Sequence, residues 1–157
     1  MRSPRVVLVR AVRSACFLLG LAAFHIVLPV AGWGQTVSLQ AQVIYAANEP
    51  GGVDSRLGNL ADHLQKTFRY SMYQLVDTPK GAVTLNETWH AGLPDNRSLE
   101  IVPTAIKDAQ YSLTVRVLGA DGKAAVNTAV RLRRGSTVLV GGPSHQKGVL
   151  IIAISAN

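Results

Sequence analysis

The sequence predicts an α+β domain in which a mostly antiparallel sheet carries one amphipathic helix, preceded by a signal peptide. Three observations lead to this prediction. Residues 109–157 alternate polar and apolar side chains around tight turns, which is typical of a β-meander. Apolar residues recur at helical spacing over residues 53–68. A cationic and then apolar stretch fills the N-terminus.

The N-terminal stretch has the layout of a secretory signal peptide. Four arginines precede an apolar run over residues 15–30, no acidic residue occurs before Glu49, and small residues follow the run. Because this order matches the three regions of a signal peptide, we expect cleavage near Gly34–Gln35. Residues 1–34 are then the signal peptide, and residues 35–157 form a single domain. An uncleaved anchor helix is the alternative, since the run has about the minimum length that spans a bilayer.

Composition excludes several classes of function for the processed chain. The whole chain has a net charge of +7, but the 12 basic and 9 acidic side chains that follow the signal peptide leave +3. This charge does not indicate nucleic-acid binding. Cys16 is the only cysteine and lies in the apolar run. The mature domain therefore lacks disulfides, thiolate catalysis and cysteine metal sites, which is compatible with a bacterial envelope.

The first elements of the domain are a strand and a helix. Residues 36–46 alternate apolar and polar side chains, which predicts a half-buried strand. Residues 53–68 follow as a single helix, with the carboxylate of Asp54 as the N-cap. Gly58 costs this helix about 1 kcal/mol relative to alanine. A helix with one apolar stripe needs a sheet to lie on, so we expect it to cover one sheet face.

Three shorter strands separate the helix from the meander. The pattern predicts them over residues 70–76, 82–90 and 98–102, the last one ended by Pro103. Turn residues lie between them, at Thr78–Gly81 and Gly92–Asn96.

The meander is predicted from its turns. Asp121–Gly122 indicates a two-residue hairpin, with positive φ angles at both residues if the turn is type I′. This turn pairs Tyr111 with Leu132, Leu113 with Val130, Val115 with Thr128 and Val117 with Val126. On the other face, Ser112, Thr114 and Arg116 lie opposite Arg131, Ala129 and Asn127.

A second turn extends the same predicted sheet. Arg134–Gly135 brings Thr137 and Leu139 opposite Leu132 and Val130, so both registers place apolar residues on one face. The last strand, Val149–Ile154, is apolar on both faces. We expect it to be either the centre of the sheet or an edge that another chain covers.

No constellation of residues predicts catalysis, a metal or a cofactor. No two of the mature histidines have metal-ligand spacing, and no serine lies in a nucleophile-elbow pattern. Ser144–His145 is expected in a solvated turn. Gly141–Gly142 follows a strand, but no helix follows it to hold a phosphate.

Two sets of side chains are candidates for binding a partner. Arginines of the meander form a possible basic edge for an acidic polymer, anionic lipid or partner protein, with edge-protecting charge as the alternative. We name Arg116, Arg131, Arg133, Arg134 and Ile152 as the possible partner-binding residues. Four aromatic residues either form a platform for sugar rings or belong to the core: Tyr70, Tyr73, Trp89 and Tyr111.

Residues 127–142 contain a strand, a glycine turn and a second strand that ends in Gly-Gly. This segment resembles the β-module of bacterial secretins, and Val149–Ile154 is similar to their later apolar strand. The resemblance covers roughly the last 35 residues. Secretins are outer-membrane pore-forming multimers of secretion and pilus systems. The resemblance therefore implies a secretin-like or secretion-associated role in the outer membrane.

These observations favour a non-catalytic, exported bacterial envelope protein that acts in binding or assembly. Its expected location is the periplasm or the outer membrane, with an envelope protein or a second copy as partner and no nucleic acid or cofactor. The alternatives are a small secreted hydrolase and a carbohydrate-binding module. A pocket that gathers His with Asp or Glu and Ser would favour the hydrolase, and a flat aromatic strip would favour the sugar binder.

Overall fold

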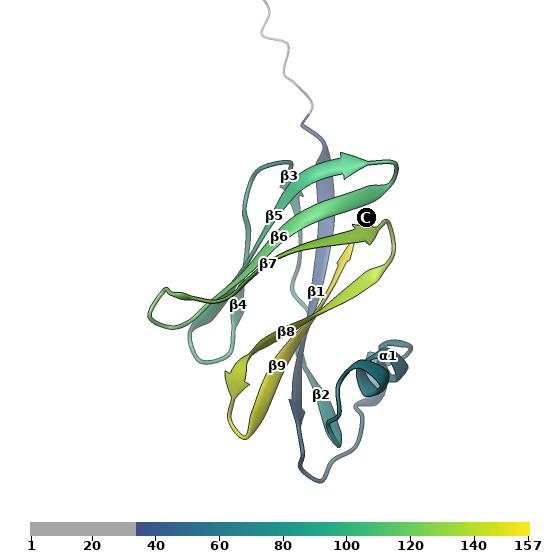
Figure 1. Cartoon of the computed structure of the whole chain (residues 1–157), viewed down its shortest axis with the longest axis vertical. Helices are drawn as coiled ribbons and strands as arrows, with labels where there is room; N and C mark the ends of the chain where they lie inside the picture. The colour runs from purple at the N-terminus through teal and green to yellow at the C-terminus, as the bar shows by residue number, and fades with distance from the viewer. Residues whose placement is uncertain (1–33) are drawn as a thin grey trace, which may run out of the picture. The chain divides into compact units, whose positions relative to one another are not determined.

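The computed structural model describes residues 34–157, which form two packed β-sheets with a short helix on one of them (Figure 1). The predicted signal peptide, except for Gly34, lies outside the described residues. Every strand pair is antiparallel, which confirms the mostly antiparallel architecture. No helix within residues 34–157 combines the length and the apolar character needed to cross a membrane.

Each sheet has a simple strand order. The first sheet follows the order β2 (Met72–Asp77), β1 (Thr36–Ala47), β9 (Gly148–Ala156) and β8 (Thr137–His145), and β3 (Lys80–Thr84) pairs with the first part of β1. The second sheet follows the order β4 (Trp89–Leu93), β5 (Arg97–Lys107), β6 (Gln110–Leu118) and β7 (Ala124–Arg133). The single meander predicted over residues 109–157 is therefore divided between two sheets, and the continuous meander is formed by β4, β5, β6 and β7.

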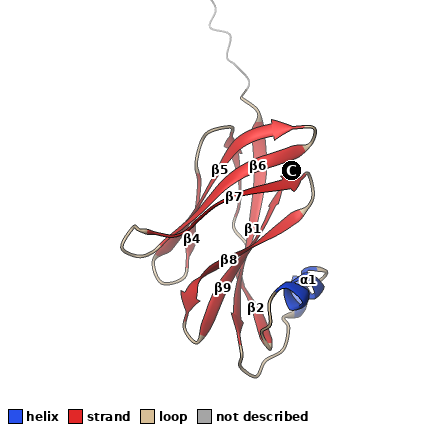
Figure 2. Ribbon diagram, in the orientation of Figure 1, coloured by secondary structure: helices blue, strands red, loops and turns tan. Residues whose placement is uncertain are grey.

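The first sheet is buried on both faces. One face packs against the second sheet through the largest apolar cluster, whose members include Val37, Val43, Leu113, Val115 and Ile152. The other face is covered by η1 (Ser55–Leu57) and α1 (Leu60–Thr67), with Leu60 and Leu64 over Ile44, Ile151 and Ala153. The expectation that the helix covers one sheet face is thus confirmed (Figure 2).

The last strand is the centre of the first sheet. β9 pairs with β1 along one edge and with β8 along the other. Ile152 and Ile154 face the second sheet, whereas Ile151 and Ala153 face the helix. Of the two alternatives for this strand, the structure shows the internal one, which explains why both faces are apolar.

The predicted single helix is interrupted. Asp54 caps η1 by accepting a hydrogen bond from the backbone N–H of Arg56, and Gly58 then adopts φ 49° and ψ −128°. This conformation suits glycine, because a Cβ atom makes it costly for other residues. The helix therefore stops and restarts as α1, and Asp54 is not the N-cap of a continuous helix.

The β6–β7 hairpin has the predicted register, but its turn differs. Tyr111 pairs with Leu132 and Val117 with Val126, as the pattern predicts. Only Gly122 has a positive φ, of 76°, and its N–H donates to the carbonyl of Gly119. The turn is therefore longer than the predicted type I′ turn, with Gly122 in the left-handed region after a β-turn.

The predicted β7–β8 hairpin is wrong. The backbone N–H of Arg134 donates to Ala109 in the second sheet, whereas that of Gly135 donates to Ala156 in the first. The turn thus carries the chain from one sheet to the other, and β8 pairs with β9 instead of β7. Pairing with β8 gives the apolar strand β9 a neighbour on its second edge.

Two strand boundaries also differ from the prediction. The strand expected over residues 82–90 is divided, because a turn with Asn86 at φ 66° separates β3 from β4. β5 does not end at Pro103 but continues to Lys107 through a bulge between Pro103 and Ala105. A bulge accommodates proline within a strand, since one residue there is left out of the ladder.

Candidate functional site

An open cavity of about 560 Å³ lies where β2, the β4–β5 turn and the β8–β9 turn meet. Its lining residues come from five parts of the chain and are mostly polar: Tyr45 of β1, Arg56 of η1, Gln74, Leu75 and Val76 of β2, Pro94 of the β4–β5 turn, and His145 and Gln146 at the end of β8. A concave site of this volume, with convergent polar groups, is the usual form of a small-ligand site.

The most specific feature of the cavity is a histidine–aspartate pair. Nδ1 of His145 lies 2.7 Å from Oδ2 of Asp95, and the two residues are separated by 50 positions in the chain. The His145 side chain is only 8% exposed, whereas that of Asp95 is 54% exposed. The pair joins the β4–β5 turn of the second sheet to the end of β8 in the first.

The neighbours of His145 determine the roles of its two ring nitrogens. An ionised carboxylate only accepts hydrogen bonds, so Nδ1 donates to Asp95. Nε2 lies 3.3 Å from the side-chain nitrogen of Gln146, which donates to it. In this arrangement Nε2 of His145 serves as a hydrogen-bond acceptor.

Asp95 also lies beside a cationic side chain. Nη1 of Arg97 lies 3.5 Å from Oδ2 of Asp95, and this nitrogen is buried without a hydrogen-bond partner. The carboxylate is thus placed between a guanidinium and an imidazole, and it directly follows Pro94, which lines the cavity.

Tyr45 forms the inner wall beside His145. The two rings lie edge to face, with centroids 5.5 Å apart. The Tyr45 hydroxyl donates to Glu49 over 3.3 Å. Burial and the Glu49 carboxylate raise the pKa of Tyr45, so the phenol remains a hydrogen-bond donor.

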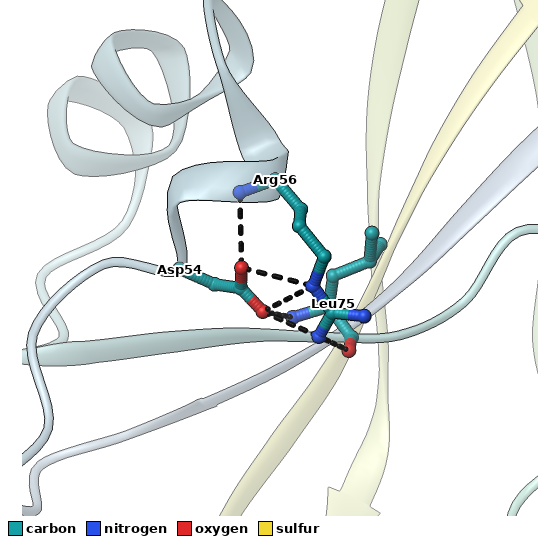
Figure 3. A network of polar contacts seen from close by, with 3 residues as sticks. All are labelled: Asp54, Arg56 and Leu75. Carbon is teal, nitrogen blue, oxygen red and sulfur yellow. Dashed lines mark hydrogen bonds and ion pairs between the residues drawn. The ribbon is translucent and has the colours of Figure 1, made fainter.

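Asp54, Arg56 and the backbone of Leu75 form a polar network (Figure 3), of which Arg56 and Leu75 line the cavity. The carboxylate of Asp54 accepts from the backbone N–H groups of Arg56 and Leu75, and Arg56 donates to Asp54 over 2.6 Å and to the Leu75 carbonyl over 2.9 Å. Hydrogen bonds from the Arg56 side chain and backbone lower the pKa of Asp54, and the same pair raises the pKa of Arg56. The side chains of Asp54 and Arg56 thus hydrogen-bond the backbone N–H and C=O of Leu75 on the outer edge of β2, where another strand would otherwise pair.

The contacts of His145 show which groups lie beside its ring. The hydrogen-bond partners of His145 are Asp95 and Gln146, and no hydroxyl or thiol within residues 34–157 bonds to it. The described residues also contain no group of three metal-ligating side chains of the His, Cys, Asp or Glu type.

Three of the arginines predicted to bind a partner share one face. Arg116 of β6 and Arg131 and Arg133 of β7 lie on the face of the second sheet that points away from the core. Arg116 donates to Glu100 over 3.0 Å. In the described part of the chain, no carboxylate lies within 4.0 Å of the side-chain nitrogens of Arg131 or Arg133.

The other two predicted residues lie elsewhere. Arg134 donates through Nε to the hydroxyl of the buried Tyr111 over 3.0 Å. This hydrogen bond holds the β7–β8 turn against β6. Ile152 is fully buried between the sheets, on the central strand β9. In the folded chain Ile152 is therefore not an accessible edge residue, which corrects its place among the partner-binding candidates.

The four aromatic residues do not form one strip. Tyr73 and Tyr111 are buried, in the helix-side and inter-sheet clusters respectively. Tyr70 packs edge to face against Tyr73, and Trp89 packs against the inter-sheet core.

Sequence patterns did not identify the histidine–aspartate pair. Ser144 and His145 were expected in a solvated turn, but they end strand β8, and His145 is buried. Asp95 lies in the predicted Gly92–Asn96 loop, which is the β4–β5 turn and reaches His145 across the two sheets. The only local signal is the turn chemistry itself, which gives no information about distant contacts.

Neither a protein-family model, nor a curated protein, nor a solved structure matches this chain.

Proposed function

We propose that this protein is an exported, non-catalytic envelope protein of a bacterium that binds a partner protein by strand addition at the outer edge of β7. The cationic and apolar N-terminus, the absence of cysteine after it, and the local resemblance to secretins support the envelope location. The binding mode is supported by one observation, which is the contrast between β7 and the other sheet edges.

β7 is the longest edge strand among the described residues, and beyond a bulge at Ala125 its residues 126–133 contain neither a proline nor a bulge. It has ten residues and pairs only with β6 in the described part of the chain. By comparison, the edge of β2 is bonded by Asp54 and Arg56, and the edge strand β8 contains Pro143 within a bulge. Sheet edges are normally blocked in such ways, because unpaired N–H and C=O groups attract other strands.

The unpaired groups of β7 can be assigned from one hydrogen bond. The N–H of Arg134 donates to Ala109, opposite it in the register of β6 and β7. Because hydrogen-bonded and non-hydrogen-bonded pairs alternate in antiparallel strands, the N–H groups of Asn127, Ala129, Arg131 and Arg133 point away from β6. They are the donors available to an added strand.

The charge of this edge favours an acidic, extended segment of another protein. β7 contains Arg131 and Arg133 and no acidic residue. An acidic segment would complement these side chains while its backbone pairs with β7. A second copy of the chain would instead bring the same arginines to the same edge.

The experiment uses a synthetic peptide of alternating valine and glutamate, with a valine–lysine peptide as the control. Hydrogen exchange by NMR should show that the acidic peptide protects the outward amides of β7, and salt should weaken its binding. Ala129→Pro removes one outward N–H group but no hydrogen bond between β6 and β7. The variant should therefore fold and lose binding of the acidic peptide. The charge reversals Arg131→Glu and Arg133→Glu together should transfer the preference to the lysine peptide.

Two results would contradict the proposal. Equal binding of the acidic peptide to the wild type and to Ala129→Pro would place the contact elsewhere. A wild-type dimer in sedimentation that Ala129→Pro dissociates would make a second copy the occupant of the edge.

A further inference from the structure

The β8–β9 turn holds a glutamine in the left-handed region, which is uncommon for residues other than glycine. Gln146 and Lys147 are the two residues between the paired His145 and Gly148, and Gln146 has φ 49°. The first central position of such a turn, when its φ is positive, is usually glycine. Strained backbone that persists in a folded protein is a sign of a functional site. Here the strained residue places its side chain against Nε2 of His145.

The cavity presents groups that both donate and accept hydrogen bonds. Gln74 and Gln146 each offer an amide with a donor and an acceptor, and both residues are exposed. Asp95 holds His145 with the Nε2 acceptor toward Gln146, so a ligand hydroxyl can take the place of the amide there.

The charges around the cavity are already compensated. Arg56 is paired with Asp54, Arg97 with Asp95 over 3.5 Å, and Lys147 with Glu49 over 3.3 Å. A charged ligand would have to break or compete with these pairs, whereas a neutral polar ligand would not.

The remaining wall is apolar. Leu75, Val76 and Pro94 line the cavity, and Val76 is an exposed large hydrophobic side chain of the described domain, at 44%. An apolar wall beside convergent amides suits a ligand with C–H surface on one side and hydroxyl groups on the other. We propose that this cavity binds a sugar residue of a neutral oligosaccharide, with Gln74, Gln146 and His145 as its hydrogen-bonding residues. This site is separate from the β7 edge and does not depend on strand addition.

The test is an NMR titration of the purified protein with two neutral trisaccharides, maltotriose and N,N′,N″-triacetylchitotriose, at millimolar concentration. At least one sugar should shift the side-chain amide signals of Gln74 and Gln146 and the ring ¹⁵N signals of His145 in a saturable manner. No shift of these signals with either sugar, or shifts confined to other parts of the domain, would overturn the proposal.

Variants separate binding from folding. Gln74→Ala should weaken sugar binding about tenfold, the effect of losing one or two hydrogen bonds, whereas the matched variant Gln110→Ala, on the outer face of the second sheet, should not. Gln146→Gly relieves the backbone strain, so it should raise the thermal midpoint and still weaken binding. If Gln146→Gly binds as tightly as the wild type, Gln146 serves only the turn and the proposed site is wrong.

Discussion

At the scale of single residues, backbone conformation decides which glycines are required. A Cβ atom at Gly122 or at Gly92 would contact no other atom within 4 Å, but only Gly122 has a positive φ, of 76°. We expect Gly122→Val to destabilise the domain by roughly 1–2 kcal/mol because valine disfavours this region. Gly92→Val, in strand β4, is the matched control and should have little effect on the denaturation midpoint. Equal midpoints for both variants would contradict this assignment of the turn.

Asp54 is the residue whose ionisation should influence stability. In the folded chain the pKa of Asp54 lies below its ordinary value of 3.8, mainly because Arg56 donates hydrogen bonds to the carboxylate. A carboxyl with a depressed folded pKa stabilises the fold fully above its unfolded pKa, and this contribution is lost as the pH falls toward the folded pKa. We therefore expect the advantage of the wild type over Asp54→Asn to shrink progressively as the pH falls below 3.8.

Urea denaturation at a series of pH values measures this difference. Arg56→Gln should flatten the same part of the pH profile, because it removes the group that lowers the pKa of Asp54. A wild-type advantage that stays constant from neutral to strongly acidic pH would show that the Asp54 network does not stabilise the fold.

Local chemistry predicted some residue contacts and not others. The alternation around Asp121–Gly122 gave the register of β6 and β7 correctly, because neighbouring strands share one turn and one apolar face. The contact of His145 with Asp95 joins turns from different sheets. No periodicity records such a contact, since it depends on how the two sheets pack.

At the scale of elements, β9 organises the domain. Its residue Ile152 is fully buried and faces the second sheet. Ile152→Lys would bury an unpaired charge, at a cost of about 4 kcal/mol or more, which is a large part of the stability of a small domain. We expect this variant to unfold and not to become a folded monomer.

Circular dichroism and solution mass measure this outcome, with Val76→Lys as the control. Val76 is 44% exposed, so lysine there should leave the fold intact. A folded Ile152→Lys protein of lower mass than the wild type would instead identify β9 as an interface.

Element types were easier to predict than element partners. The apolar character of Val149–Ile154 predicted a strand covered on both sides, and the helical spacing predicted the cover over one face. The second sheet was missed because the Arg134–Gly135 turn is compatible with either a hairpin or a crossing between sheets. The hydrogen bonds of this turn to Ala109 and Ala156 make it a crossing between the sheets, and both partners are distant in sequence.

At the scale of the whole molecule, the two proposed binding regions occupy different parts of the sandwich. The β7 edge belongs to the second sheet, whereas the cavity lies where β2 meets the β4–β5 and β8–β9 turns. Because they share no residue, a variant of one region is an internal control for the other. Ala129→Pro should retain sugar binding, and Gln74→Ala should retain binding of the acidic peptide.

The fold also limits where a signal peptidase could cut the chain without damaging the domain. β1 begins at Thr36, which pairs with Thr84, and Val37 is fully buried against the second sheet. Cleavage near Gly34–Gln35 would leave every described strand intact, whereas cleavage beyond Val37 would remove core side chains.

Expression of the full gene in a Gram-negative host should therefore give a periplasmic product whose N-terminus lies close to Gln35. Leu21→Arg, which interrupts the apolar run, should keep the protein in the cytoplasm. Recovery of the wild type only in the cytoplasm with Met1 intact would contradict export, and a membrane-bound product that retains Met1 would identify an anchor.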